Sequence, residues 1–330
     1  MPENIIVAER LGRDFALRRQ SKPGLRGWFT KGTRETVCAV ADLSFAIEAG
    51  AKVAFIGPNG AGKSTTLRML CGLLRPTSGT AQVCGLVPWE ETRQLSKSIG
   101  LVFGQRSHLW PSLPVRDSYD LLAKIYDLAP QDYHAQRVRL AAVFGLDELL
   151  DQPARTLSLG QRMRCDLGAA LLHQPPVLFL DEPTIGLDVV AKAQLRDHLN
   201  LLAQEFNTTI LLTSHDTDAI ERICSRVMLI DRGCKLLDTS LGELQRNYTR
   251  FKTLRLVTGE EAPAYERPGV TAIERGSHRL VLTVDTGAAP LEQVMADCLG
   301  RFSVQDIAIE GLPLEEIIKG IYAGGLGEAL

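Results

Sequence analysis

The stretch "GPNGAGKS", residues 57–64, decides how the first part of this chain is expected to fold. It follows "AKVAFIG" (51–57), an apolar run that predicts a buried strand, and it leads into "KSTTLRMLCGLL" (63–74), which predicts a helix. Its spacing fits GxxxxGK[ST], a loop whose backbone N–H groups surround phosphate oxygens. The loop consists of Gly57, Pro58, Asn59, Gly60, Ala61, Gly62, Lys63 and Ser64, followed by Thr65. We interpret it as a phosphate-binding loop between a strand and a helix.

The residue types in this loop each suit one part of a nucleotide. The glycines let the backbone curl around the phosphate chain. Lys63 is expected to reach the β- and γ-phosphates, Ser64 to bind Mg²⁺, and Thr65 to contact an α-phosphate oxygen. The loop therefore predicts a magnesium-dependent nucleotide site.

Two further apolar runs end in residues that suit the same chemistry. "VLFLDE" (177–182) ends in Asp181, placed to hold Mg²⁺ through water, and Glu182, placed to polarise the attacking water. Paired acids at a strand end also occur simply as caps of the following turn. "TTILLTSH" (208–215) ends in His215, which is either a core histidine or a contact to the γ-phosphate. We favour the functional interpretation for both, because both strands would end beside the phosphate loop.

The composition limits the class of protein. The 330 residues are 45% hydrophobic and 23% charged, with a formal net charge of -2, which suits about two globular domains and argues against nucleic-acid binding. The seven cysteines show no metal-ligand spacing, so we expect reduced, buried thiols. The N-terminal residues carry charges where a signal peptide needs an apolar run, and no apolar stretch approaches the ~20 residues of a spanning helix. We expect a soluble chain that reaches a membrane only through a partner.

Alternating strands and helices predict an α/β domain with a largely parallel sheet. Further strands are expected at 99–104, 177–182 and 208–215, and a helix at 188–206 with its apolar face formed by Leu195, Leu199, Leu202 and Phe206. Residues 105–158 have a wholly helical pattern. After about residue 250, strands at 279–284 and 304–309 and helices at 290–299 and 313–322 predict a small βαβα-type module, with both helices packed on the strands.

The chain resembles the ATP-binding subunits of ABC transporters over residues 1 to about 250. The motifs that carry the resemblance are "GPNGAGKS", Gln105 after "LVFG", "LSLGQ" (157–161), "VLFLDEP" (177–183), "GLD" (186–188) and "SH" (214–215). The resemblance implies a P-loop ABC ATPase domain over 1–250, with a helical subdomain at about 106–165. Residues 251–330 would form a small C-terminal α+β, ferredoxin-like domain for regulation or dimerisation, or a packing appendage without such a role.

The resemblance also implies roles for particular residues. Gln105 would sense Mg²⁺ and the attacking water and couple the site to the membrane subunit. Glu182 would be catalytic, His215 a γ-phosphate switch and Asp188 a dimer contact. Phe15 would stack on adenine, with Trp28 or Phe29 as substitutes because an insertion blurs the register.

"LSLGQ" is implied to act in a second copy of the chain. In the family, Ser158, Gly160 and Gln161 contact the γ-phosphate of ATP held by the other protomer's phosphate loop. Leu159 stands where the family has glycine in LSGGQ, a departure that bears on loop geometry and on turnover rate. The implied cofactors are ATP and Mg²⁺, and the implied assembly is a homodimer or a pair with a similar ATPase subunit.

The class of ABC protein follows from what the chain contains. A single phosphate loop differs from the translation ATPases, and the absence of sustained heptads differs from the repair and chromosome ATPases. "GQRSHLWPSLPVRDSYDLL" (104–122), "LSLGQRMR" (157–164) and the short tail resemble exporters with separate permease subunits, which handle drugs, lipids or polysaccharides. We expect a drug-like or lipid-like substrate, with importer and non-transport ABC ATPases as alternatives.

The expected location is the cytoplasmic face of the cell membrane, held there through the permease. Residues 10–34 are strongly basic, with Asp14 as their one acid. They form either a solvated loop or a contact with anionic headgroups or the permease.

Overall fold

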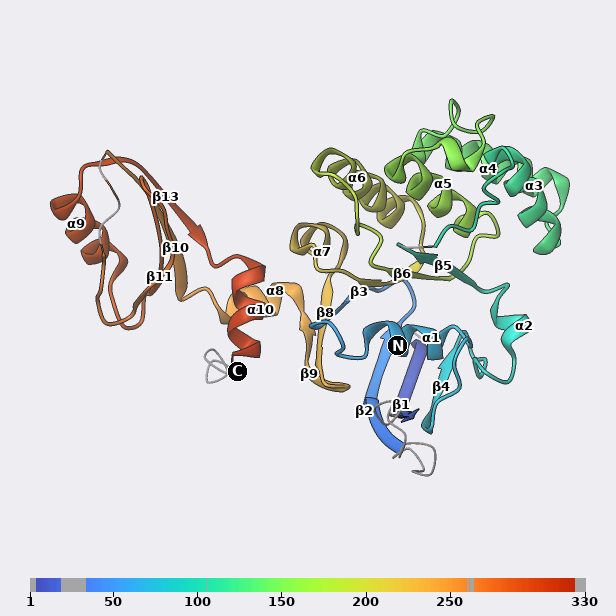
Figure 1. Cartoon of the computed structure of the whole chain (residues 1–330), viewed down its shortest axis with the longest axis horizontal. Helices are drawn as coiled ribbons and strands as arrows, with labels where there is room; N and C mark the ends of the chain where they lie inside the picture. Colours follow the sequence, from blue (N-terminus) through green and yellow to red (C-terminus); the bar gives the residue numbers. More distant parts are fainter. Residues whose placement is uncertain (1–3, 19–33, 105, 260, 262–263, 324–330) are drawn as a thin grey trace, which may run out of the picture. The chain divides into compact units, whose positions relative to one another are not determined.

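The computed structural model describes residues 4–18, 34–104, 106–259, 261 and 264–323 of the chain (Figure 1). The chain divides into two compact units, Met1–Thr239 and Ser240–Leu330. Within the described residues, no helix combines the length and the apolar character needed to cross a membrane.

The centre of the first unit is a six-stranded sheet with the strand order β5-β6-β7-β3-β8-β9. The strands are β5 (Ile99–Phe103), β6 (Val177–Asp181), β7 (Thr209–Thr213), β3 (Lys52–Ile56), β8 (Arg226–Asp231) and β9 (Cys234–Ser240). The pairings from β5 to β8 are parallel, which confirms the predicted α/β class. Because parallel strands end at the same edge, the segments after β3, β6 and β7 meet there.

Helices α1 (Lys63–Leu70), α2 (Thr92–Leu95), α6 (Val189–Glu205) and α7 (Thr217–Ile223) belong to the same unit. The apolar face predicted for α6 is buried through Leu195, Leu199 and Leu202, with Phe206 directly after the helix. The helix predicted over 63–74 ends at Leu70, because the chain turns at Gly72 with a φ of 73°.

A three-stranded antiparallel sheet, which the sequence pattern did not predict, lies beside α1 (Figure 1). Its order is β2 (Arg34–Glu48), β1 (Asn4–Arg18) and β4 (Ser78–Val83). Ile6 and Ile47 from this sheet share one core with Phe55 of β3 and Leu67 of α1. The sheet is therefore fixed to the strand and helix that hold the phosphate loop.

A helical layer follows β5, as predicted, and is drawn in green in Figure 1. It contains α3 (Val115–Ile125), α4 (Pro130–Phe144), the 3-10 turn η2 (Ala154–Thr156) and α5 (Leu159–Leu171). The buried Tyr119 hydroxyl donates to the Cys165 carbonyl oxygen at 2.7 Å and so joins α3 to α5.

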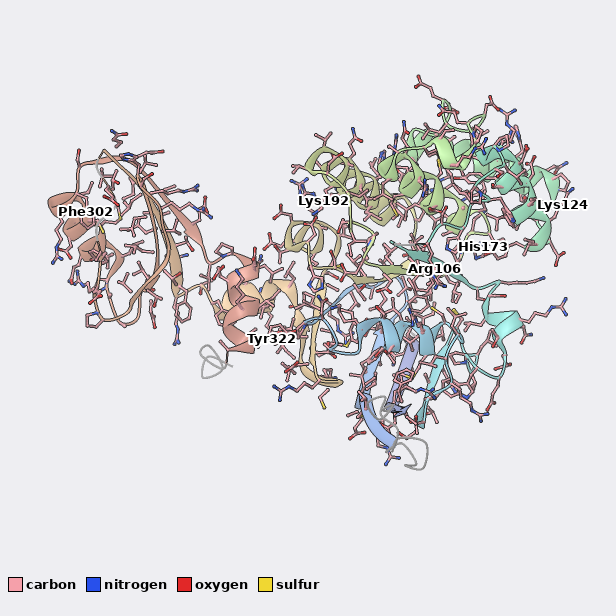
Figure 2. All side chains as sticks on the ribbon, viewed as in Figure 1. Arg106, Lys124, His173, Lys192, Phe302 and Tyr322 are labelled. Carbon is pink, nitrogen blue, oxygen red and sulfur yellow. The ribbon has the colours of Figure 1, made fainter. Side chains whose placement is uncertain are left out.

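His173 connects the end of α5 to β5 and α3 (Figure 2). Its ring stacks on Tyr126 with the centroids 3.9 Å apart, and its Nε2 atom lies 3.0 Å from the Ile99 carbonyl oxygen. Burial lowers the pKa of His173 to about 4, so the imidazole is neutral in the folded chain at pH 7.

The second unit contains α8 (Leu241–Asn247), β10 (Phe251–Thr258), β11 (Val270–Arg275), β12 (Arg279–Asp285), α9 (Leu291–Arg301), β13 (Val304–Gly311) and α10 (Leu314–Tyr322). Its antiparallel sheet has the order β11-β12-β10-β13, the strand order of a ferredoxin-like domain. The described residues between β10 and β11 place Tyr265 in the core and form no helix there.

The four elements of the predicted βαβα pattern are present as β12, α9, β13 and α10, but the prediction missed two strands and is wrong on the packing of one helix. The sheet has four strands, because β10 and β11 pair with the predicted β12 and β13. The core of the sheet contains Val294 and Cys298 of α9, whereas the buried residues Leu314 and Ile317 of α10 lie outside that core. The prediction that both helices pack on the strands therefore holds for α9 alone.

Candidate functional site

The phosphate loop has the local geometry that its glycines allow. Gly60 and Gly62 adopt φ values of 85° and 102°, in the left-handed region that favours glycine. A β-carbon at Gly62 would lie 2.5 Å from the Ala39 carbonyl oxygen of β2, so this position also needs glycine for space. The loop therefore packs directly on the antiparallel sheet as it turns into α1.

Lys63, the first residue of α1, is buried with its ammonium group inside the loop. Its Nζ atom donates to the carbonyl oxygens of Gly57 at 2.6 Å and Pro58 at 3.3 Å, and lies 3.4 Å from Nε2 of His215. Burial lowers the pKa of Lys63, and the nearby Glu182 and Asp181 carboxylates oppose that shift. The lysine charge is thus held next to two acids at the carboxyl end of the sheet.

Asp181, the last residue of β6, is fixed by hydroxyl groups from two other elements. Its Oδ1 atom accepts from Ser64 Oγ of α1 at 3.2 Å and from Thr213 Oγ1 of β7 at 2.7 Å. The Ser64 hydroxyl and the Asp181 carboxylate are hard oxygen donors, which Mg²⁺ prefers, and a magnesium site commonly completes its shell with water and phosphate oxygens. The described residues contain no cluster of three or more His, Cys, Asp or Glu side chains able to hold a metal.

Glu182 is held in an unusual backbone conformation beside Asp181. Its φ is 52°, a region that costs a non-glycine residue about 1–3 kcal/mol. The N–H group of Glu182 donates to both the carbonyl oxygen and Oγ1 of Thr213 at 3.0 Å, which stabilises this turn. The Oε1 atom of Glu182 is buried and has no hydrogen-bond partner in the described part of the chain, although it lies 3.2 Å from Nε2 of His215. The strained φ and the unpaired oxygen together make Glu182 a candidate functional residue.

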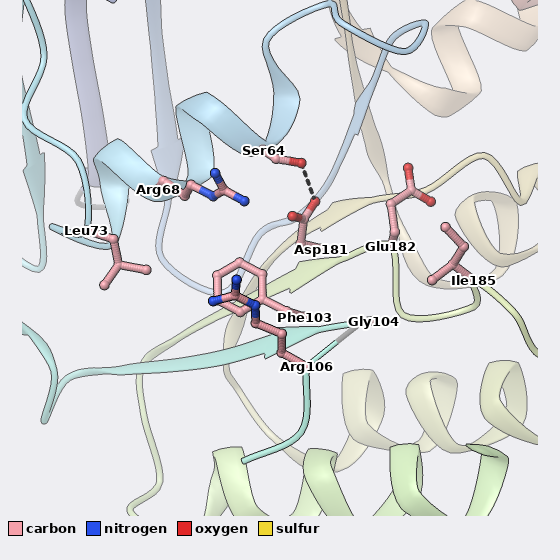
Figure 3. A pocket seen from close by; sticks show the side chains of 9 residues that line it. All are labelled: Ser64, Arg68, Leu73, Phe103, Gly104, Arg106, Asp181, Glu182 and Ile185. Carbon is pink, nitrogen blue, oxygen red and sulfur yellow. Dashed lines mark hydrogen bonds between the residues drawn. The ribbon is translucent and has the colours of Figure 1, made fainter. Parts of the chain in front are cut away.

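A cavity of about 480 Å³ opens beside these residues (Figure 3). It is lined by Ser64, Arg68, Leu73, Phe103, Gly104, Arg106, Asp181, Glu182 and Ile185. A β-carbon at Gly104 would overlap the Glu182 carbonyl oxygen, so glycine lets β5 approach the end of β6. Sequence reasoning missed Arg68 and Arg106. Arg68 lies one helical turn after Ser64, and Arg106 directly follows Gln105 in the sequence. Neither position is specific enough to predict a residue that lines the cavity.

The segment that contains "LSLGQ" forms the start of α5. Ser158 Oγ accepts from the Gln161 N–H at 3.2 Å, and Gln161 Oε1 accepts from the Ser158 N–H at 2.9 Å, a reciprocal capping box. A β-carbon at Gly160 would lie 3.0 Å from the Ala191 β-carbon of α6. Leu159 is 39% exposed, and its Cδ2 atom lies 3.2 Å from where a β-carbon of Gly186 would be. The start of α5 is thus packed against the "GLD" segment of the same chain.

The other predicted residues occupy separate places. Asp188 caps α6 by accepting from the Ala191 N–H at 2.8 Å. Phe15 lies on β1 opposite Val37, with the Arg13 guanidinium 4.8 Å from its ring centroid. The set of residues that lines the cavity does not include Phe15, Ser158 or Asp188. Gln105, Trp28 and Phe29, and most of the basic segment 10–34, fall outside the described residues.

Comparisons with known proteins agree with this arrangement. Residues 40–185 match the ABC transporter family. The chain is 30% identical over 283 residues to "Linearmycin resistance ATP-binding protein LnrL" of Bacillus subtilis, covering 84% of this chain and 89% of that protein. It is 35% identical over 191 residues to "Probable multidrug ABC transporter ATP-binding protein YbhF" of Escherichia coli, covering 58% of this chain and 32% of that protein. It is 37% identical over 197 residues to "Nod factor export ATP-binding protein I" of Burkholderia lata, covering 59% and 64%.

Solved structures share the fold. One is the structure of cbiO1 from Clostridium perfringens, described as part of the ABC transporter complex cbiONQ. It is 25% identical to this chain with a TM-score of 0.59, and the match covers 75% of this chain and 95% of that chain. A dimeric ADP-bound and phosphate-bound ATP-binding cassette, MJ0796, is 23% identical with a TM-score of 0.59, covering 72% and 98%. The resemblance inferred from the motifs is confirmed. The chain belongs to the ABC transporter family and is an ATP-binding subunit that hydrolyses ATP.

Proposed function

We propose that this subunit powers the export of a drug-like or lipid-like compound through separate membrane permease subunits. It would do so by ATP-driven pairing with a second copy or with a similar ATPase subunit. The observation that carries the ATPase part is the convergence of Lys63, Ser64, Asp181 and Glu182 at one edge of the sheet. The names of the relatives, which refer to antibiotic resistance, multidrug transport and Nod factor export, support the choice of export.

Nucleotide binding falls to the phosphate loop. The backbone N–H groups of residues 57 and 59–65 and the Lys63 ammonium bind the phosphate chain, and the Gly57 and Pro58 carbonyls hold that ammonium in position. Ser64 and, through water, Asp181 would hold Mg²⁺, which would neutralise charge on the phosphates. Phe15 stacks on adenine, since it lies on the antiparallel sheet against which the phosphate loop packs.

Hydrolysis depends on the strained turn after β6. Glu182 orients and polarises the attacking water through its carboxylate, whose Oε1 atom has no hydrogen-bond partner among the residues that the structure describes. The Nε2 atom of His215 lies between the Glu182 carboxylate and the Lys63 ammonium. We assign to His215 the contact with the γ-phosphate by which the site responds to bound ATP. We assign to Gln105, by its sequence motif alone, the role of sensing Mg²⁺ and the attacking water and of coupling the site to the permease.

The second half of the site comes from the partner subunit's α5. The N–H groups and positive dipole end of that helix suit a phosphate anion. The hydroxyl of Ser158 accepts from Gln161 in its cap and can still donate its own proton to a γ-phosphate oxygen. Asp188 contacts the partner from the start of α6, and the unit beginning at Ser240 stabilises the pairing or regulates turnover. We place the assembly at the cytoplasmic face of the membrane, held by the permease.

Glu182→Gln tests the proposal, because the amide keeps the shape of the side chain but loses its basic carboxylate. We expect a fall in kcat of more than about 100-fold with ATP still bound. In this variant, ATP should raise the dimer fraction measured by sedimentation. Glu148→Gln, at an exposed position in the helical layer, is the control and should behave as wild type. Wild-type turnover in Glu182→Gln would refute the role of Glu182, and a strictly monomeric protein at saturating ATP, with and without permease, would refute the pairing.

A further inference from the structure

Asp166 is a buried carboxylate that the mechanism above does not use. It lies inside α5 with 3% of its surface exposed. Its Oδ1 atom accepts from Ser107 Oγ at 2.8 Å and from the His108 N–H at 2.7 Å. Burial raises the pKa of Asp166, and these two hydrogen bonds act in the opposite direction. Burying a carboxylate costs free energy unless hydrogen-bond donors pair with it. Both donors to Asp166 come from one loop, which is therefore the neighbour that matters for its role.

That loop, Arg106–Leu109, follows the end of β5 and is anchored at several points. Ser107 Oγ accepts from the Leu109 N–H at 3.1 Å, and the Arg106 N–H donates to the Phe103 carbonyl oxygen at 3.1 Å. Arg106 also lines the cavity that contains Ser64 and Glu182 (Figure 3). Asp166 is thus bonded to the same short loop that forms one wall of the catalytic cavity.

The chain directly after β5 is also fixed to β6, the strand that ends in Asp181. The Gly104 N–H donates to the Asp181 carbonyl oxygen at 2.9 Å. Gly104 is therefore anchored on β6, and Ser107 is anchored on α5. A displacement of α5 relative to the sheet changes the separation of these anchors, and so acts on the cavity wall between them.

Helix α5 also carries Ser158 at its start, about two turns before Asp166. A helix of this length is stiff, and α5 is joined to α3 by the Tyr119 hydroxyl. A force on Ser158 from a partner-bound phosphate would therefore move Asp166 with the rest of the helix. In this way one side chain connects the segment that would contact the partner's ATP to the cavity of its own chain.

We propose that Asp166 is a positioning residue that holds the Arg106–Leu109 loop on α5, so that engagement of Ser158 with the partner's nucleotide is transmitted to the cavity containing Glu182. The inference rests on the proposed function for the roles of Ser158 and Glu182. Turnover, rather than ATP binding, should depend on this carboxylate, because the phosphate loop has no hydrogen bond to Asp166.

The test compares kcat with ATP affinity in variants of the full chain. Asp166→Ala removes both hydrogen bonds and should lower kcat about tenfold or more, with the Kd for ATP within about twofold of wild type. Asp166→Asn keeps an Oδ1 acceptor for both donors and should restore most of the turnover. Ser107→Ala, at an exposed position, removes one of the two bonds to Asp166 together with the acceptor of the Leu109 N–H, and should give an intermediate kcat.

Gln136→Ala is the matched control for a purely structural effect. Gln136 is also buried, and its Nε2 atom donates to the Leu171 carbonyl at the end of α5, at 3.1 Å. It should lower stability in urea unfolding without changing kcat. An unchanged kcat in Asp166→Ala, an equal fall in kcat in Gln136→Ala, or no rescue by asparagine would overturn the inference. If Asp166→Ala does not fold, an unchanged kcat in Ser107→Ala would overturn the inference instead. A wild-type protein without ATPase activity would instead contradict the proposed function.

Discussion

Thr213→Val is the substitution that most selectively tests how β7 organises the Asp181 and Glu182 carboxylates, which we propose to be functional. Valine keeps the shape of this fully buried side chain and removes only the hydroxyl. The variant loses the bond from Oγ1 to Asp181 Oδ1 at 2.7 Å and the acceptance from the Glu182 N–H at 3.0 Å. Asp181 keeps its bond from Ser64, and the Glu182 N–H keeps the Thr213 carbonyl oxygen, so both carboxylates are loosened but neither backbone position is lost.

The size of the effect follows from these two bonds. A hydrogen bond to a charged group contributes about 1.5–3 kcal/mol, and the second, shared bond contributes about 0.5–1 kcal/mol. We therefore expect the free energy of unfolding to fall by about 2–4 kcal/mol. If about half of that energy also holds the carboxylates in their reactive positions, kcat falls about tenfold. The Kd for ATP should stay close to wild type, because the phosphate loop is untouched.

Thr209→Val is the matched control, since Thr209 is buried on the same strand and its Oγ1 accepts from the Gly50 N–H at 2.9 Å. It should lower the free energy of unfolding by about 1–2 kcal/mol and leave kcat unchanged. Urea unfolding, ATP titration and steady-state hydrolysis measure the three quantities. Normal turnover in Thr213→Val, or an equal loss of turnover in Thr209→Val, would refute the argument that Thr213 positions the carboxylates.

Two other predictions concern regions outside the catalytic cavity. Acidification from pH 6.5 to 4 should remove about 3 kcal/mol of stability through His173, because the unfolded chain binds that proton near pH 6.5 and the folded chain only near pH 4. His173→Gln should show a correspondingly weaker loss of unfolding free energy over this range, and an equal loss in both proteins would contradict the assignment. Deletion after Arg250, which removes β10 to α10, should leave ATP affinity within about twofold of wild type while altering dimerisation or transport-coupled turnover. A truncated protein that folds but does not bind ATP would show that the nucleotide domain extends further, and one that hydrolyses, dimerises and supports transport normally would show that the tail has no regulatory role.

Four of the parallel strands, β3, β5, β6 and β7, were predictable because they are buried on both faces and read as short apolar runs. "VLFLDE" and "TTILLTSH" are such runs, and both end in the polar residues that form the site. The antiparallel sheet was missed because β1 mixes charged and apolar residues, as in "NIIVAERLGRDFALR", and its register shifts interrupt any alternation. In the second unit, β10 was missed for the same reason, since Lys252 and Arg255 break its apolar pattern.

Some residues of the candidate site could be predicted from sequence motifs, whereas others depend on how the strands and helices pack. Ser64, Asp181 and Glu182 follow from motifs of fixed spacing, and the structure brings them to one cavity. The strained φ of Glu182 and the bonds of Thr213 depend on the approach of β7 to β6, for which no local signal exists. The contact between Asp166 and Ser107 joins positions far apart in the chain, so only the packing of α5 against the loop after β5 could reveal it.

The central claim is that one ATP is held between Lys63 of one copy and Ser158 of the other. It is tested most directly by mixing two variants, Lys63→Ala and Ser158→Ala, each also carrying Glu182→Gln to prevent hydrolysis. In a mixed dimer both defects fall in the same composite site, and the other site is intact. Neither variant alone should form an ATP-dependent dimer in sedimentation, whereas the mixture should form one that retains a single ATP per pair. A mixture that stays monomeric while the Glu182→Gln parent dimerises with ATP, or a Ser158→Ala variant that dimerises alone as well as that parent, would contradict the shared site.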